Sequence, residues 1–354
     1  MPHPLDDATY VTRLDPKEML RLTREFPDQC RSALAISQKA TLSPLKSVPT
    51  CAVLTGLGGS AAGGDFVKAL FESEGSIPFS VNRDYHVPNS VGPDTLVIAS
   101  SYSGNTEETL SAYGEARGRS AQILGVTSGG TLASRAEADG VPVIRIPGGQ
   151  PPRTALGFML VPVVVACERY GLLPAHDHDA TFGHLDACVR AWDVSQPLES
   201  NPAKQLASAL QGAVGILYGL GPWQAAVANR WKGQINENAK NMAFANAFPE
   251  LNHNEILGWV KAGEQGVDKW VTIVLRDGNE SAKMNERARV TTDLTHGVSE
   301  TYSALAPGGT LWERILGLAL LGDFVSLYLA ALNGVDPENI DSINVLKASL
   351  GKIE

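Results

Sequence analysis

Positive charge is scarce in this sequence of 354 residues, which has 29 Lys and Arg residues against 38 Asp and Glu residues. Its formal net charge is −9 at pH 7. Proteins that bind duplex nucleic acid usually carry a basic stripe that neutralises phosphates. We therefore expect no nucleic-acid partner, although an acidic protein still binds single anions through backbone N–H groups and hydroxyls.

Cysteine is also sparse, and its four residues have no short spacing: Cys30, Cys51, Cys167 and Cys188. This pattern excludes a disulfide framework and a C-x-x-C metal knuckle. We interpret the four residues as reduced thiols in a cytoplasmic protein.

Long uninterrupted apolar runs are missing. The longest, around Leu156–Cys167, is shorter than the ~20 residues that span a bilayer and contains Pro162. The acidic N-terminus has no apolar segment of the kind found in signal peptides. We therefore expect no membrane partner.

A group of histidines suggests a metal site at first sight. His176, His178 and His184 lie near Asp177 and Asp179, but no Cys is nearby and the H-E-x-x-H spacing is absent. We interpret the segment as a polar linker between domains and expect no metal.

Alternating strand and helix patterns are what the sequence does contain. Short apolar runs such as Cys51–Thr55, Thr95–Ser100 and Trp270–Arg276 are each followed by a polar or glycine-containing segment, and most of these precede a helical stretch. This alternation is typical of βαβ units. Hydrophobic residues make up 44% of the chain, and its length suits more than one domain. We predict an α/β protein with two doubly wound domains, each a parallel sheet flanked by helices.

A partial repeat supports the division into two. Gly219-Leu220-Gly221 matches Gly56-Leu57-Gly58 at an offset of 163 residues, and each follows a short apolar run. Three identical residues also arise by chance, but the matching strand–loop–helix context favours duplication. We predict an N-terminal domain with a leading helix over residues 1–175 and a C-terminal domain with a helical tail over residues 176–354.

Two polar loops at predicted strand ends form a candidate anion site. Gly58-Gly59-Ser60 precedes a helix but lacks the Lys of a P-loop and does not fit G-x-G-x-x-G, so a dinucleotide is disfavoured. Alone, this loop is equally well explained as a tight turn. The second loop, residues 100–106, is rich in hydroxyls. Ligands of doubly wound sheets bind at the carboxyl ends of the strands. We predict that Ser60, Ser101, Ser103 and Thr106 bind a phosphate, a role compatible with Thr106 also being a helix N-cap.

Several motifs of the sequence resemble those of a known family. G-L-G-G-S followed by S-Y-S-G-N-T is similar to the phosphosugar-binding SIS fold. The later segments 230–240 (RWKGQINENAK) and 248–255 (FPELNHNE) resemble the bifunctional phosphoglucose/phosphomannose isomerases. The resemblance implies phosphate binding by Gly59 and the four hydroxyl residues, with Arg153, Glu237, His253 and Lys347 as catalytic residues. The family has a threonine near its C-terminal segment that is associated with room for the mannose epimer. Residues 336–340 of this sequence contain no counterpart of that threonine.

The roles implied by the resemblance fit the chemistry of an aldose–ketose isomerase. A neutral-range histidine, His253, suits ring opening, and a glutamate, Glu237, suits moving a proton between C2 and C1. Arg153 would stabilise the enediolate. The resemblance also implies a homodimer with shared active sites, in which His253 comes from the partner, and it implies no cofactor. The alternatives are a non-catalytic sugar-phosphate sensor and an isomerase of another phosphosugar.

Overall fold

The computed structural model describes residues 3–350, which form two compact units. The N-terminal unit contains Glu25–Asp186 and Gly308–Leu316. The C-terminal unit contains Ala187–Pro307, together with the described residues up to Arg24 and from Gly317 onward. Both units consist of more than one segment of the chain, whereas the predicted domains are each one continuous segment. The division into residues 1–175 and 176–354 therefore stays a prediction.

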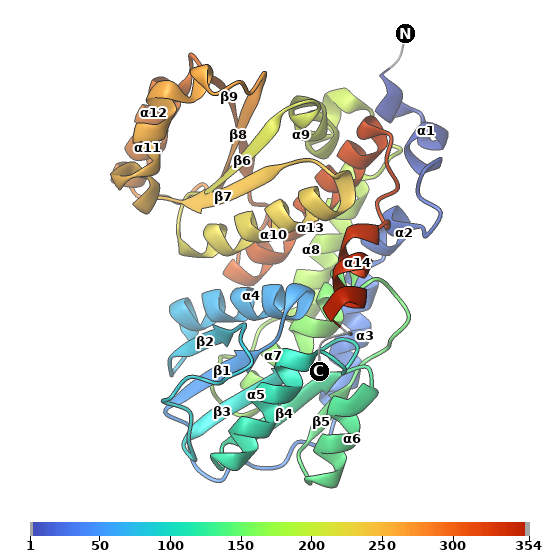
Figure 1. Cartoon of the computed structure of the whole chain (residues 1–354), viewed down its shortest axis with the longest axis vertical. Helices are drawn as coiled ribbons and strands as arrows, with labels where there is room; N and C mark the ends of the chain where they lie inside the picture. Colours follow the sequence, from blue (N-terminus) through green and yellow to red (C-terminus); the bar gives the residue numbers. More distant parts are fainter. Residues whose placement is uncertain (1–2, 351–354) are drawn as a thin grey trace. The chain divides into compact units, whose positions relative to one another are not determined.

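The N-terminal unit is built on a parallel sheet of five strands in the order β2-β1-β3-β4-β5 (Figure 1). Its strands are β1 (Cys51–Thr55), β2 (Phe79–Asn82), β3 (Thr95–Ser100), β4 (Gln122–Thr127) and β5 (Val143–Arg145). Its helices are α3 (Phe26–Lys39), α4 (Gly58–Glu74), α5 (Glu107–Gly118), α6 (Gly130–Ala138), η2 (Pro152–Thr154), α7 (Leu156–Arg169) and the start of α8 (His178–Trp192).

Burial on both faces explains why these strands consist of continuous apolar runs rather than alternating patterns. Every residue of β3 and β4 is buried. On one face, Ala112 and Tyr113 of α5 and Leu132 of α6 join a core with strand residues such as Val97. Helices α3, α4 and α7 pack together in the same unit, and α7 also contacts β4. The carboxyl ends of the strands are thereby left to the loops that precede α4, α5 and α6.

The C-terminal unit repeats this design with a parallel sheet in the order β7-β6-β8-β9. Its strands are β6 (Val214–Gly219), β7 (Ala243–Ala247), β8 (Trp270–Arg276) and β9 (Ser299–Leu305). Its helices are η1 (Pro4–Asp6), α1 (Ala8–Thr12), α2 (Met19–Arg24), η3 (Leu198–Ser200), α9 (Pro202–Leu210), α10 (Pro222–Ala239), η4 (Glu250–His253), α11 (Glu255–Gly258), η5 (Trp259–Glu264), α12 (Ala282–Thr295), most of α13 (Leu311–Asn333) and α14 (Asp341–Leu350).

The four strands of the C-terminal sheet follow the order of the first four strands of the N-terminal sheet, which agrees with the predicted duplication. The pair β6 and β8 occupies the positions of β1 and β3. The predicted α/β class with two doubly wound parallel sheets is confirmed.

One described helix, α13, is long and apolar enough to cross a membrane by length and composition. Its most apolar window of 18 residues is completely buried in the protein. A buried core helix passes the same test of composition, so α13 is weak evidence for a membrane span.

The interpretation of His176–Asp179 as a polar linker is wrong. His176 and His178 are nearly buried and lie within hydrogen-bonding distance of Glu168, and His176 also contacts Glu74. The pairing could not be predicted from the sequence, because these glutamates belong to α4 and α7 and contact the histidines only in the folded unit. Among the residues that the structure describes, no group of three or more His, Cys, Asp and Glu residues is arranged to hold a metal ion.

Candidate functional site

The first loop of the candidate site joins β1 to α4 and places Gly59 and Ser60 in the first turn of the helix. Gly58 has a φ of 52°, a conformation that favours glycine. A Cβ atom at Gly59 would lie 3.0 Å from the carbonyl oxygen of Pro152 and 3.8 Å from the Cα of Arg153. Glycine therefore allows the loop to approach the segment that carries Arg153, while Ser60 is buried beside it.

The second loop joins β3 to α5 and is organised by its own hydroxyls. Ser101 Oγ and Thr106 Oγ1 share a hydrogen bond of 2.9 Å, and Ser101 Oγ also accepts one from the Gly104 N–H. Gly104 has a φ of 71°, and a Cβ there would lie 1.8 Å from the carbonyl oxygen of Gly129. Ser103 is exposed, and its Oγ accepts from the Asn105 N–H. The loop is therefore held in one shape by contacts that only glycine permits at residue 104.

Thr106 occupies the N-cap position of α5 but makes no side-chain cap hydrogen bond. Leu57, the N-cap residue of α4, makes none either. Unsatisfied N–H groups at helix starts attract anions. The first turn of α5 also contains Glu107 and Glu108, so attraction of an anion has to come from the N–H groups and hydroxyls rather than from net charge.

The two loops lie next to each other at the carboxyl end of the sheet. A Cβ atom at Gly56, the first residue after β1, would lie 2.7 Å from the Ser100 carbonyl oxygen and 3.2 Å from the Ser60 Cβ. The structure thus places the starts of the two loops that carry the predicted phosphate-binding residues side by side, as expected from the adjacent pairing of β1 with β3.

Arg153 lies in η2, and only 7% of it is exposed. Gln29 of α3 holds the end of this segment, because its Nε2 donates to the Thr154 carbonyl and its Oε1 accepts from the Gly157 N–H. The backbone of Arg153 therefore lies beside Gly59, at the first of the two loops. A surface role for Arg153 is excluded by its burial.

Glu237 lies near the end of α10 in the C-terminal unit and is half-buried. The same helix presents Arg230, Gln234 and Asn238, four residues apart, to α13. Arg230 and Gln234 donate to the carboxylate of Asp323, and Asn238 donates to Ser326 Oγ. These buried hydrogen bonds fix the rotation of α10 and with it the direction of Glu237.

Asp323 was missed by the sequence analysis. Its signal was available, because it is a lone acid in the middle of the long apolar stretch of α13. Burial raises its pKa, while Arg230 and Gln234 favour its charged form. An acid at such a position normally has a buried partner, and Asp323 has Arg230.

His253 and Glu237 lie at opposite edges of the C-terminal sheet. The Asn236 side chain accepts from the N–H of Ala243, the first residue of β7, which places the end of α10 at the amino edge. The Phe248 N–H donates to the carbonyl of Gly219 at the carboxyl edge, and His253 follows five residues later, exposed at the end of η4. The length of β7 alone separates the two edges by ~13 Å. Figure 1 shows α10 and β7 running in opposite directions.

Lys347 lies on α14, the helix that follows α13. Its side chain is outside the described part of the structure. The segment that leads into α14 lies at the same edge as Glu237, because Lys240 Nζ donates to the carbonyls of Glu237, Asp336 and Pro337.

Comparisons with known proteins agree with these features. Residues 50–147 match the SIS domain, and residues 199–350 match the bacterial phospho-glucose isomerase C-terminal SIS domain. The chain is 39% identical to a bifunctional phosphoglucose/phosphomannose isomerase of Caldicellulosiruptor bescii, over 95% of this chain and 100% of that relative. It is 34% identical to the enzyme of the same name from Aquifex aeolicus, over 88% and 92% of the two chains.

Among solved structures, a hypothetical protein of Thermus thermophilus has the same fold with a TM-score of 0.72 and 17% identity. The match covers 98% of this chain and 93% of that one. The sequence relatives and the two domain matches together show that this chain belongs to the family of bifunctional phosphoglucose/phosphomannose isomerases.

Proposed function

We propose that this protein interconverts glucose 6-phosphate and mannose 6-phosphate with fructose 6-phosphate through a cis-enediolate. The observation that carries the proposal is the hydroxyl-rich pair of loops beside the buried Arg153, in a chain of this family. A phosphate needs several directed donors, and the enediolate needs a cation placed in advance. The N-terminal unit offers both.

Each residue has one task in this mechanism. Ser60, Ser101, Ser103, Thr106 and the N–H of Gly59 hold the phosphate. His253 moves the proton that opens the sugar ring. Glu237 removes the C2 proton of the open chain and returns it to C1, or to C2 from the other face.

Arg153 and Lys347 act on the oxygens of the sugar in this proposal. The guanidinium of Arg153 stabilises the negative charge of the enediolate, an effect worth ~3 kcal/mol when the group is preorganised. Its burial and the support from Gln29 favour such preorganisation. Lys347 contacts the sugar itself.

The active sites are shared between two copies of the chain in this proposal. Glu237 and His253 of one chain stand at opposite edges of one sheet, and general acid–base groups must lie within hydrogen-bonding reach of the atoms they serve. We therefore assign His253 of one copy to the substrate held by Glu237 of the other, in a symmetric homodimer. The protein acts in the cytoplasm without a cofactor, and with no nucleic-acid or membrane partner.

The test is a coupled assay in which glucose 6-phosphate and mannose 6-phosphate are offered separately to the wild type, Glu237→Gln and Glu72→Gln. Glu72 is a half-exposed residue of α4 paired with Lys68, and serves as the control. We expect activity on both sugars, a loss of at least ~10² in Glu237→Gln, and no loss in the control. Activity on neither sugar, or full activity of folded Glu237→Gln, contradicts the proposal.

A further inference from the structure

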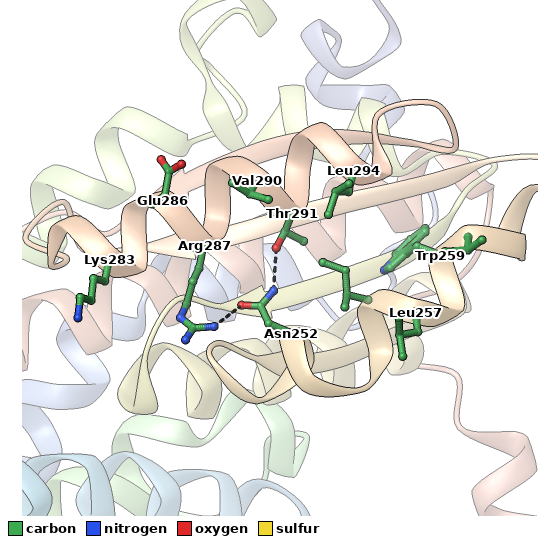
Figure 2. Close-up of a pocket in the computed structure, with 11 residues that line it drawn as sticks. Asn252, Leu257, Trp259, Lys283, Glu286, Arg287, Val290, Thr291 and Leu294 are labelled. Atoms are coloured by element: carbon green, nitrogen blue, oxygen red, sulfur yellow. Dashed lines mark hydrogen bonds between the residues drawn. The ribbon is translucent and has the colours of Figure 1, made fainter.

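An apolar groove lies between the α11–η5 segment and α12 in the C-terminal unit (Figure 2). Its volume is about 640 Å³. Leu257, Val260, Val290 and Leu294 line it, and each is between 37% and 75% exposed. Exposed apolar surface of this kind in a globular protein marks an interaction site.

The groove is lined next to His253, because Asn252, which directly precedes it in the sequence, is one of the lining residues. Asn252, the preceding residue, donates from its side chain to Thr291 Oγ1 of α12 at 2.8 Å and accepts from Arg287. Figure 2 shows Asn252 between these two residues of α12. Asn254, the following residue, caps α11. A partner that occupies the groove therefore touches the elements that hold His253.

Helix α14 has a face that matches such a groove. It contains 10 residues, and all its described side chains are exposed, including Ile343, Val345 and Leu346. Helices of this length are marginal in water without packing. Ile343 and Leu346 have the i, i+3 spacing with which amphipathic helices fill apolar grooves.

Charge also matches at one end. The groove has Lys283 and Arg287 at the start of its α12 wall and Leu294 toward the end. Glu286 lies between the two cations and forms an ion pair with Arg289, so the excess charge at this end is positive. Helix α14 begins with Asp341 and becomes apolar toward Leu346. An α14 helix that runs parallel to α12 brings Asp341 toward the cations and Leu346 toward Leu294.

We infer that α14 of one copy docks into the α11–η5–α12 groove of a second copy of this chain. This inference rests on the proposed shared active site. There His253 of one copy must meet Glu237 of the other. The groove adjoins His253, and the segment leading into α14 lies against the end of the helix that carries Glu237. Docking in both directions gives a closed twofold dimer.

Self-association of four purified full-length proteins tests the inference: wild type, Leu294→Glu, Leu346→Glu and the control Val48→Glu. Val48 is 81% exposed and lies outside both surfaces. We expect dimers in sedimentation velocity for the wild type and the control. Each groove or helix variant should dissociate with a Kd at least ~30-fold higher, as expected for a central interface residue.

A charge-pair experiment tests the specific pairing. Leu294→Lys and Leu346→Glu chains, each monomeric alone, should form a mixed dimer when combined, because one interface then has complementary charges. If Leu294→Glu and Leu346→Glu have the same dimer Kd as the wild type, the proposed docking is wrong. An equal defect in Val48→Glu, or no mixed dimer, overturns it as well.

The isomerase assay separates this inference from the proposed function. If the wild type is active and dimeric, and the groove and helix variants dimerise equally well, the proposed isomerase and its shared site stand. Only the α14 contact is then refuted. An active monomeric wild type removes the docking and the sharing together, but not the isomerase activity. A dimer that dissociates as expected but isomerises no sugar phosphate supports the docking and contradicts the proposed function.

Discussion

Individual residues of the two proposed phosphate-binding loops differ in how much the fold depends on them. Ser101 is buried, bonded to Thr106, and satisfies the Gly104 N–H, whereas Ser103 is exposed. Both residues could be selected from the sequence, because a turn rich in glycine and serine between a strand and a helix is a pattern of neighbouring residues. Their different structural roles were not predictable, because they depend on contacts of Gly104 with a loop 25 residues further along.

A pair of alanine variants tests this difference. Ser101→Ala should raise KM roughly tenfold to a hundredfold. It should also destabilise the protein by ~1–3 kcal/mol, because two side-chain hydrogen bonds are lost, one with Thr106 Oγ1 and one from the Gly104 N–H, which keeps only the backbone carbonyl of residue 101. Ser103→Ala should raise KM with a stability change of no more than ~0.5 kcal/mol. Ser134→Ala, on the exposed side of α6, is the control. Steady-state kinetics and thermal unfolding measure the two effects. Equal stability loss in both loop variants contradicts this assignment.

At the scale of whole elements, strands that read as apolar runs were predictable, and the edge strands β7 and β9 of the C-terminal sheet were not. The apolar runs of β1, β3 and β8 stand out in sequence, and their predicted bounds match the structure. Strand β7 reads Ala-Phe-Ala-Asn-Ala, and β9 is mostly polar. Both lie at edges of the C-terminal sheet and are formed by pairing with neighbours. Without β7, the separation of Glu237 from His253 remained hidden.

The histidine cluster of the N-terminal unit is the clearest case of long-range pairing. Burial alone would raise the pKa of Glu168, but hydrogen bonds from His176 and His178 lower it to about 2. Burial alone would lower the pKa of His176, but contacts with Glu168 and Glu74 raise it above its ordinary value of 6.5. The cluster therefore acts as a pH-dependent tie between α4, α7 and the segment before α8.

This tie predicts a defined pH dependence. The contribution of His176 is complete below its ordinary pKa of 6.5 and is lost as pH rises through the raised pKa of the folded state. The contribution of Glu168 is complete above its ordinary value of 4.5 and is lost as pH falls toward about 2. The two windows overlap between these ordinary values.

His176→Gln should therefore lower Tm most between pH 4.5 and 6.5, by ~2–4 °C for each kcal/mol lost. The difference from wild type should shrink at higher pH. His86→Gln is the control, because His86 is 81% exposed at its side chain and contacts Glu115 at the surface. Thermal unfolding at several pH values measures both variants. A Tm difference that does not vary with pH contradicts the role of protonated His176.

For the whole molecule, one strand order used in both units explains why a three-residue match in sequence indicated duplication. The proposed sharing of active sites between two copies rests on the topology of the C-terminal sheet. In a parallel βαβ unit the helix returns to the amino edge. A base at the end of α10 and a histidine after β7 are consequently kept apart within one chain, and composition and motifs do not show this.

Mixing two inactive variants tests the shared active site most directly. Glu237→Gln chains keep His253, and His253→Ala chains keep Glu237. Each homodimer should isomerise poorly. After exchange of subunits at equal concentrations, half of the dimers are mixed and each holds one intact site, so activity should return to about a quarter of the wild-type value. Activity that stays at the level of the separate variants, with mixed dimers shown to be present, contradicts the shared site.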